Sequence, residues 1–206
     1  MEFEGDFETH WTVVEDRRVG LERITEVARR HGLKVTHIVL SRGASRSQLM
    51  LTRRRQTTLS VELADAQSMA RGLGREGLQV QRVKIETCVD NDDIPMTNEV
   101  ARVEASRYFE HHIKVRHERS ADLRPVTLVA EAHDAHLSRS VMGENNDGGV
   151  QRFVTQRCYG VGLPTAETLL EALNTALADA DLDVLSTTQE YVVYDSNIAL
   201  DAGWIE

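Results

Sequence analysis

The stretch Phe7-Glu8-Thr9-His10-Trp11-Thr12-Val13 recurs 102 residues later as Phe109-Glu110-His111-His112-Ile113-Lys114-Val115. Further matches follow in the same order along the chain. Leu21 to His31 lies over Leu123 to His133 at helical spacing, and Val80 and Glu86 lie over Val184 and Glu190. Matches that keep their order at a nearly fixed offset are the signature of an internal repeat. The sequence therefore predicts one module that is present twice.

Each copy has the apolar periodicity of strand, helix, strand, strand, helix and strand. The expected strands are 7–14, 35–41, 48–55 and 78–88 in the first half, and 108–116, 136–141, 151–158 and 184–194 in the second. The expected helices are 19–32 and 121–134, and one after each of the caps Ser60 and Thr165. Glycine-rich turn residues at 143–149 indicate a longer loop in the second copy. This βαββαβ order is that of the ferredoxin-like motif.

We therefore predict an α+β fold of two tandem ferredoxin-like halves, whose antiparallel sheets face a shared cleft because helices cover only one face of each sheet. The expected boundaries are 1–89 for the first half, 90–106 for a linker, and 107–206 for the second half with a C-terminal tail. Trp204 in that tail is expected to pack back on the body. An interaction site or a junction to another domain is the alternative for this segment.

Composition excludes several classes of protein. Hydrophobic residues make up 41% and charged residues 28% of the 206 residues, as in ordinary globular proteins. No apolar run is long enough for a membrane span, and the acidic N-terminus differs from a signal peptide. These features predict a cytoplasmic protein that has no membrane partner. Cys88 and Cys158 lack the spacing of a disulfide framework or a zinc site, so we expect two buried free thiols.

The net charge of −9 is unevenly distributed. Residues 1–98 carry 15 basic and 15 acidic side chains, whereas residues 99–206 carry 9 basic and 18 acidic ones. General nucleic-acid binding requires a basic surface that neutralises phosphates. The sequence therefore argues against it, while basic groups such as Arg54 remain available for a small anion.

The repeated first strand carries the most function-like pattern. Period-two alternation places Phe7, Trp11 and Val13 on the face toward the helices, and Glu8, His10 and Thr12 on the uncovered face. The second copy repeats this with Glu110, His112 and Lys114 on the uncovered face. Polar groups are costly to bury there unless they meet a ligand or one another.

Basic groups of several types around one cleft suit an anionic, oxygen-rich ligand such as a phosphate. We therefore predict that the cleft binds a phosphorylated small molecule or nucleotide, and the sequence leaves open whether it also hydrolyses or transfers this ligand. The expected catalytic residues are His10 and His112, and Glu86 and Glu190 are expected to reach the same space. The expected ligand-binding residues are Thr12, Lys114, Arg54, Arg157, Glu8, Glu110, Lys84, His136 and Ser138.

Two alternatives remain open at this point. The same polar set could be a structural interface between the halves in a non-catalytic interaction or scaffold module. A metal site made of His10, His112 and either His37 or His136 is also conceivable, although strand spacing would keep these side chains about 10 Å apart. No cofactor and no metal are assigned from the sequence.

The histidine motifs resemble those of two families. His10-Trp11-Thr12 and His136-Leu137-Ser138 are similar to the two His-x-Thr/Ser motifs of the 2H phosphoesterases, which implies a duplicated α/β core and histidines acting as acid and base. Glu110-x-His112-x-Lys114 and Thr52-Arg53-Arg54-Arg55 look similar to the Glu-x-Glu-x-Lys and arginine strands of the triphosphate tunnel enzymes. Both resemblances imply a phosphorylated ligand and an enzyme of the phosphoesterase or phosphotransferase type.

Overall fold

The computed structural model describes residues 2–15, 19–118, 122–141 and 149–205. Its first half contains β1 (Glu4–Val13), α1 (Gly20–Arg30), β2 (Lys34–Leu40), β3 (Ser47–Thr58), α2 (Leu59–Arg75) and β4 (Val80–Cys88). Its second half contains β5 (Tyr108–Glu118), α4 (Arg124–Ala132), β6 (Ala135–Ser140), β7 (Gly149–Tyr159), α5 (Leu163–Asp179) and β8 (Asp183–Asp195). The short helix α3 (Asn98–Val103) joins the halves. The expected loop at 143–149 lies almost wholly outside the described residues.

All eight strands form one closed antiparallel barrel in the order β1-β3-β2-β6-β7-β5-β8-β4. Within each half the order is fourth, first, third and second strand, so both halves have the same α+β arrangement of six elements. Two seams close the barrel, where β2 pairs with β6 and β4 pairs with β8. The expected pair of separate sheets facing a cleft is therefore corrected to one continuous sheet around a shared interior.

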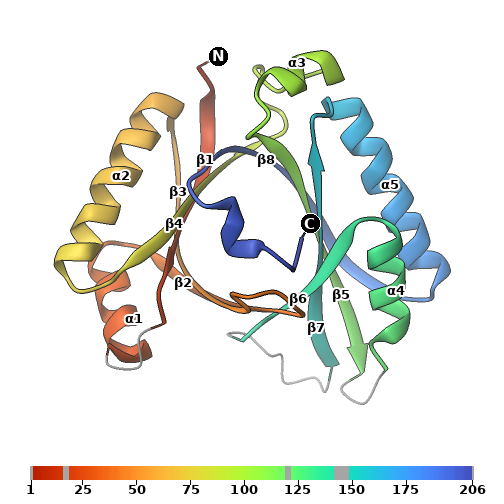
Figure 1. Cartoon of the computed structure of the whole chain (residues 1–206), viewed down its shortest axis with the longest axis horizontal. Coiled ribbons are helices and arrows are strands. Elements are labelled where there is room, and N and C mark those ends of the chain that lie inside the picture. The colour runs from red at the N-terminus through yellow and green to blue at the C-terminus, as the bar shows by residue number, and fades with distance from the viewer. Residues whose placement is uncertain (1, 16–18, 119–121, 142–148, 206) are drawn as a thin grey trace.

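The four long helices lie on the outside of the barrel, α1 and α2 beside the first half and α4 and α5 beside the second (Figure 1). Trp11 is fully buried between β1 and α2, where its indole Nε1 donates to the Ala66 carbonyl at 2.9 Å. In the second half Ile113 has the equivalent place and packs in a cluster with Val126 and Leu173. The predicted alternation of the first strands is thereby confirmed, because their apolar faces make these cores.

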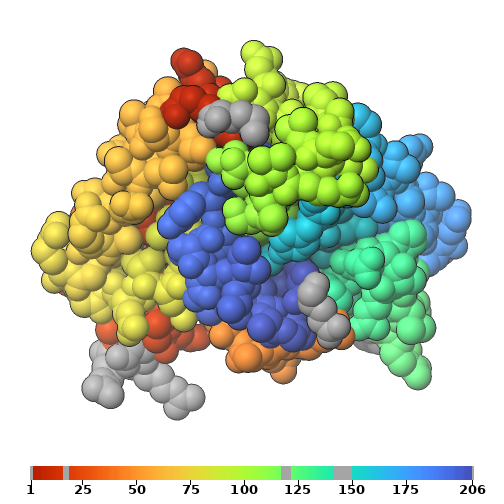
Figure 2. All heavy atoms as spheres, turned by 45° about the horizontal axis from the view of Figure 1, so that its top comes forward, coloured from red at the N-terminus to blue at the C-terminus, as the bar shows by residue number. Residues whose placement is uncertain are grey.

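The C-terminal segment crosses the ring of strands instead of trailing away from it (Figure 1). It consists of a 3-10 turn, Ile198–Asp201, followed by Trp204. The Trp204 side chain is buried, and its Nε1 donates to the Leu137 carbonyl at 3.0 Å. Gly43 has φ of +99°, and a Cβ there would lie 3.1 Å from the Trp204 amide nitrogen. The prediction that Trp204 packs back on the body is confirmed, and Figure 2 shows the segment lying between the two halves.

Both cysteines are free, as expected. Cys158 is buried, and burial raises the pKa of its thiol to about 12. Cys88 is exposed at the end of β4, so the prediction of a buried thiol is wrong for this residue. None of the described helices is long and apolar enough to cross a membrane.

Candidate functional site

The barrel contains a cavity of about 600 Å³ that is lined by residues of both halves. The register of the sheet places the polar residues of the interior in matched rows. On three adjacent strands of the first half, His10 lies beside Thr52 and Lys84, and Glu8 lies beside Arg54 and Glu86. In the second half, His112 lies beside Thr155 and Thr188, and Glu110 lies beside Arg157 and Glu190. The internal repeat therefore produces two equivalent sets of side chains that face one cavity.

Ten of the eleven residues predicted for the site line this cavity: His10, His112, Thr12, Lys114, Arg54, Arg157, Glu8, Glu110, Lys84 and Ser138. His136 is not among the residues that line it. Its ring lies near Trp204, with 6.3 Å between the ring centroids, and Arg42 Nη2 is 3.2 Å from its Nδ1. The docked tail thus separates His136 from the cavity.

The three-histidine metal site does not form among the described residues. His37 is on the outer face of β2, where its Nε2 lies 2.8 Å from the Ser47 hydroxyl. The neighbouring residues Thr36 and Ile38 face the cavity instead. Alternation along β2 therefore keeps His37 away from His10 and His112.

Buried ion pairs connect the two halves across the interior. Arg82 pairs with Asp195 and with Asp201, and Asp201 also accepts from Arg157 at 2.7 Å. Arg157 Nε donates to Glu110 at 2.6 Å, and Glu110 in turn pairs with Lys84. Burial alone would lower the pKa of Lys84, but the charges of Glu110 and Glu86 outweigh it and raise this pKa above its ordinary value. In this network the basic and acidic side chains stay ionised and form ion pairs with one another.

The two histidines differ in how well their carboxylate partners hold them. His10 Nε2 lies 2.8 Å from Glu86 Oε2, and His10 Nδ1 lies 2.9 Å from the Thr52 hydroxyl. His112 Nδ1 lies 3.1 Å from the Thr155 hydroxyl, and its Nε2 lies 3.3 Å from Glu110 Oε2 and 3.8 Å from Glu190 Oε2. Burial and then the charge of Glu86 raise the pKa of Glu190 to about 7. The second set is also the more exposed of the two, because the His112 side chain is 30% exposed and that of His10 is 14% exposed.

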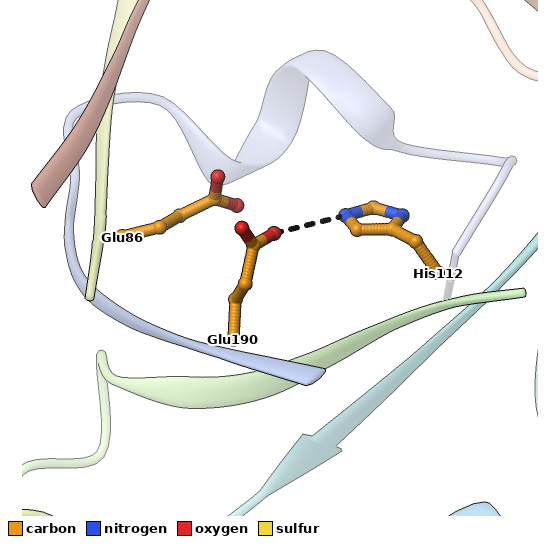
Figure 3. A group of neighbouring side chains, drawn as sticks. All are labelled: Glu86, His112 and Glu190. Atoms are coloured by element: carbon orange, nitrogen blue, oxygen red, sulfur yellow. Dashed lines mark ion pairs between the residues drawn. The ribbon is translucent and has the colours of Figure 1, made fainter. Parts of the chain in front are cut away.

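Glu86, His112 and Glu190 converge on one point of the cavity (Figure 3). One ligand atom from each lies within 4.8 Å of the other two. They come from β4, β5 and β8, so both halves contribute. Carboxylate and imidazole groups in this arrangement can hold a divalent cation or exchange protons.

All three lysines of the chain, Lys34, Lys84 and Lys114, line the cavity. The remaining 21 basic residues are arginines. Lys34 and Lys114 have no carboxylate partner among the residues that the structure describes, and Lys114 Nζ lies over the Phe153 ring at 5.4 Å from its centroid. Sequence analysis missed Lys34 and Phe153. The available signal for Lys34 was the scarcity of lysine in the sequence. A chain that has only three lysines and places all of them on one cavity indicates that the cavity requires this side chain.

The interior also contains residues that sequence analysis did not single out for the site. Arg82, Gln48 and Asp201 are buried, and Gln48 Nε2 donates to Asp201 Oδ1 at 2.6 Å. Asp201 is more than 100 residues from these partners in the chain. No local pattern of residues marks such a contact.

Comparisons with known proteins do not assign the chain to a family. No protein-family model and no curated protein match the chain. Solved structures that match include the regulatory subunit of aspartate kinase from Thermus thermophilus, at 12% identity over 85% of this chain and 95% of that one, with a TM-score of 0.33. The small subunit of acetolactate synthase from Thermotoga maritima matches at 13% identity over 91% and 94%, with a TM-score of 0.30. A chlorite dismutase mutant from Candidatus Nitrospira defluvii matches at 17% identity over 93% and 92%, also with a TM-score of 0.30.

These matches are to regulatory subunits and a chlorite dismutase, and not to a 2H phosphoesterase or a triphosphate tunnel enzyme. Both resemblances drawn from the sequence are therefore wrong. The physical reason is the nature of the motif. Period-two alternation puts polar residues at every second position of any strand that has one face toward a polar interior. A short motif such as Glu-x-His-x-Thr or Glu-x-His-x-Lys therefore does not identify a family.

Proposed function

We propose that the protein binds a small anionic molecule inside its barrel, with phosphorylated compounds as the first class to test. The observation that carries this proposal is the placement of all three lysines on the cavity. Lysine is a flexible, strongly hydrated point charge that suits phosphate and carboxylate groups. Two of the three, Lys34 and Lys114, are left for a ligand, because Lys84 is held by Glu86 and Glu110.

The charge of the cavity supports the same proposal. Its lining carries six basic and five acidic side chains, which gives a net charge of +1 with neutral histidines. The whole chain has a net charge of −9. A positive interior in an acidic protein attracts anions to the cavity and disfavours them elsewhere on the surface. The volume of about 600 Å³ is also in the range of small-molecule sites.

Affinity for matched pairs of compounds tests the proposal. AMP is compared with adenosine, and glucose 6-phosphate with glucose, together with citrate as a phosphate-free anion. We expect an anionic compound to raise the melting temperature while its uncharged counterpart does not, because a ligand that binds the folded state stabilises it. If none of the phosphorylated or carboxylated compounds stabilises the protein, the proposal is wrong.

Lys114→Met identifies the site, because methionine keeps the apolar stem and removes the charge. Loss of one charge-assisted contact is expected to weaken binding by about 10- to 100-fold. Arg71→Ala is the matched control, since Arg71 is an exposed basic residue of α2 outside the barrel. Equal affinity in Lys114→Met and wild type would place the anion elsewhere.

Lysine-selective acetylation followed by mass spectrometry gives an independent measurement. Every lysine of the chain lines the cavity, so this reagent probes the site and little else. A bound anion is expected to protect Lys34 and Lys114 from acetylation. Unchanged modification at saturating ligand would contradict binding in the cavity.

A second candidate is a non-catalytic interaction or scaffold module, and the buried ion-pair network favours it. Arg82, Arg157 and Lys84 are each satisfied by carboxylates of the protein itself, as a structural interface between halves requires. This candidate predicts no stabilisation by any anion and no protection of the lysines. The proposal assigns a binding role and no reaction.

A further inference from the structure

Glu86 and Glu190 occupy equivalent places in the two halves but have different neighbours. In the first half, the residue of β4 that lies beside His10 is Lys84. In the second half, the residue of β8 that lies beside His112 is Thr188. Glu86 therefore has Lys84 Nζ at 2.6 Å and His10 Nε2 at 2.8 Å. Glu190 has His112 at 3.8 Å as its ion-pair partner within the described part of the chain. The second site thus lacks the positive charge that its counterpart contains.

The two carboxylates also lie close together inside the barrel. The Glu86 side chain is 2% exposed and the Glu190 side chain 17%. Glu86 Oε1 is buried and has no hydrogen-bond partner among the described residues, because its contact with Lys84 is an ion pair without hydrogen-bond geometry. Two neighbouring carboxylates in a low-dielectric interior repel each other unless one of them is protonated or a cation lies between them. Lys84 is the one lysine near Glu86 and Glu190 among the described residues, and it also pairs with Glu110. Its charge therefore compensates the repulsion between Glu86 and Glu190 only in part.

We propose that Glu86, His112 and Glu190 form a site for a divalent metal ion that bridges the two halves of the barrel. Figure 3 shows the three side chains pointing toward one another. The three ligand atoms lie within 4.8 Å of one another, whereas metal bonds of about 2.0–2.2 Å place such atoms roughly 3–4.4 Å apart. Small side-chain rotations therefore complete the site without movement of the strands.

The ligand set indicates which metals fit. Two carboxylates and one imidazole provide two negative charges in total, which a divalent ion neutralises. Imidazole favours first-row transition metals, and carboxylates accept Mn²⁺ as well as Mg²⁺. We therefore assign Mn²⁺ or Zn²⁺ to the site in preference to Mg²⁺ or Ca²⁺, which prefer ligand sets made of oxygen alone.

This inference rests on the proposed function in one respect, which is the role of the metal toward the anion. Three protein ligands leave coordination positions open, and these face the cavity that also contains Lys34 and Lys114. An oxygen of a phosphorylated ligand can occupy an open position. The metal would thus add a divalent positive charge to a cavity in which the lysines provide single charges.

The test is direct binding of Mn²⁺ and of Zn²⁺, each measured alone, to the full chain after treatment with EDTA and removal of the chelator. We expect one ion per chain by calorimetry and by metal analysis after dialysis. Glu190→Gln and His112→Gln should each lower the affinity by about 10-fold or more, because each removes one of three ligands. Glu171→Gln is the control, since Glu171 is an exposed acidic residue of α5.

Two results would overturn the inference. One is the absence of bound metal in wild type, and the other is equal affinity in Glu190→Gln, His112→Gln and wild type while circular dichroism shows all three folded. Anion binding is measured separately with EDTA present. If it depends on Lys114 while no metal binds, the metal site is wrong and the proposed function stands. If metal binds through Glu190 but no anion binds, the proposed function is wrong and the metal site stands.

Discussion

At the scale of single residues, Glu190 has an unusual electrostatic environment. Its carboxylate is mostly buried, and burial together with the charge of Glu86 raises its pKa to about 7. In the unfolded chain this carboxyl has a pKa of about 4.3. The folded protein therefore binds a proton at Glu190 more tightly than the unfolded chain does. This contribution to stability is complete below about pH 4.3 and is lost as the pH rises through 7.

Glu190→Gln removes this pH dependence, because glutamine has a similar shape and does not ionise. In EDTA-containing buffer at pH 8.5 we expect the variant to be more stable than wild type by about 2 kcal/mol, and at pH 5 by much less. Urea denaturation at both pH values measures the difference. Glu171→Gln should show the same small change at both pH values. A Glu190→Gln variant that is less stable at pH 8.5 would show that the carboxylate is compensated by a partner.

At the scale of elements, the C-terminal segment contributes a buried charge to a barrel that it does not help to form. Asp201 accepts from Gln48 at 2.6 Å, from Arg82 at 2.7 Å and from Arg157 at 2.7 Å. Burial would raise the pKa of Asp201, but the charges of Arg82 and Arg157 outweigh it and hold this pKa below its ordinary value. The carboxylate therefore stays ionised at neutral pH and fastens the tail to both halves.

Asp201→Asn is expected to destabilise the protein by about 3 kcal/mol, because Arg82 and Arg157 each lose one buried carboxylate partner and keep only Asp195 and Glu110, respectively. Asp179→Asn on the exposed face of α5 is the control and should change stability by less than about 0.5 kcal/mol. Urea unfolding at pH 7 measures both variants. Equal stability of Asp201→Asn and wild type would show that the tail is held by Trp204 and its neighbours alone.

The elements that sequence analysis predicted correctly are those whose pattern is local. The alternation of Phe7, Glu8, His10 and Trp11 reports a half-buried strand wherever its neighbours lie, and the repeat doubles that information. Closure of the barrel was not predicted, because β2 has the same pattern whether its edge is free or paired with β6. Asp201 was missed for the same reason, since its partners are brought to it by the tertiary fold alone.

At the scale of the whole molecule, the two halves share one interior and are joined by two seams. Three residue pairs join β2 to β6, from Ile38 with Ser140 to Leu40 with Ser138, and a longer ladder joins β4 to β8. Ion pairs such as Lys84 with Glu110 and Arg82 with Asp195 cross between the halves inside the barrel. Unfolding one half would remove these ion-pair partners from the other half and leave its edge strands unpaired at both seams, so the halves should not be stable independently.

We therefore expect the chain to unfold in one cooperative transition, although it is longer than most two-state domains. Its two tryptophans allow this to be measured at two places, because Trp11 lies in the core of the first half and Trp204 lies on the second half at the Leu137 carbonyl. Trp204→Phe leaves fluorescence from Trp11, and Trp11→Phe leaves fluorescence from Trp204. In each variant, the fluorescence and far-ultraviolet circular dichroism curves in urea should share one midpoint. A Trp11 transition that is displaced from the circular dichroism transition would mean that the first half unfolds as an independent domain, and that the shared interior does not couple the two copies.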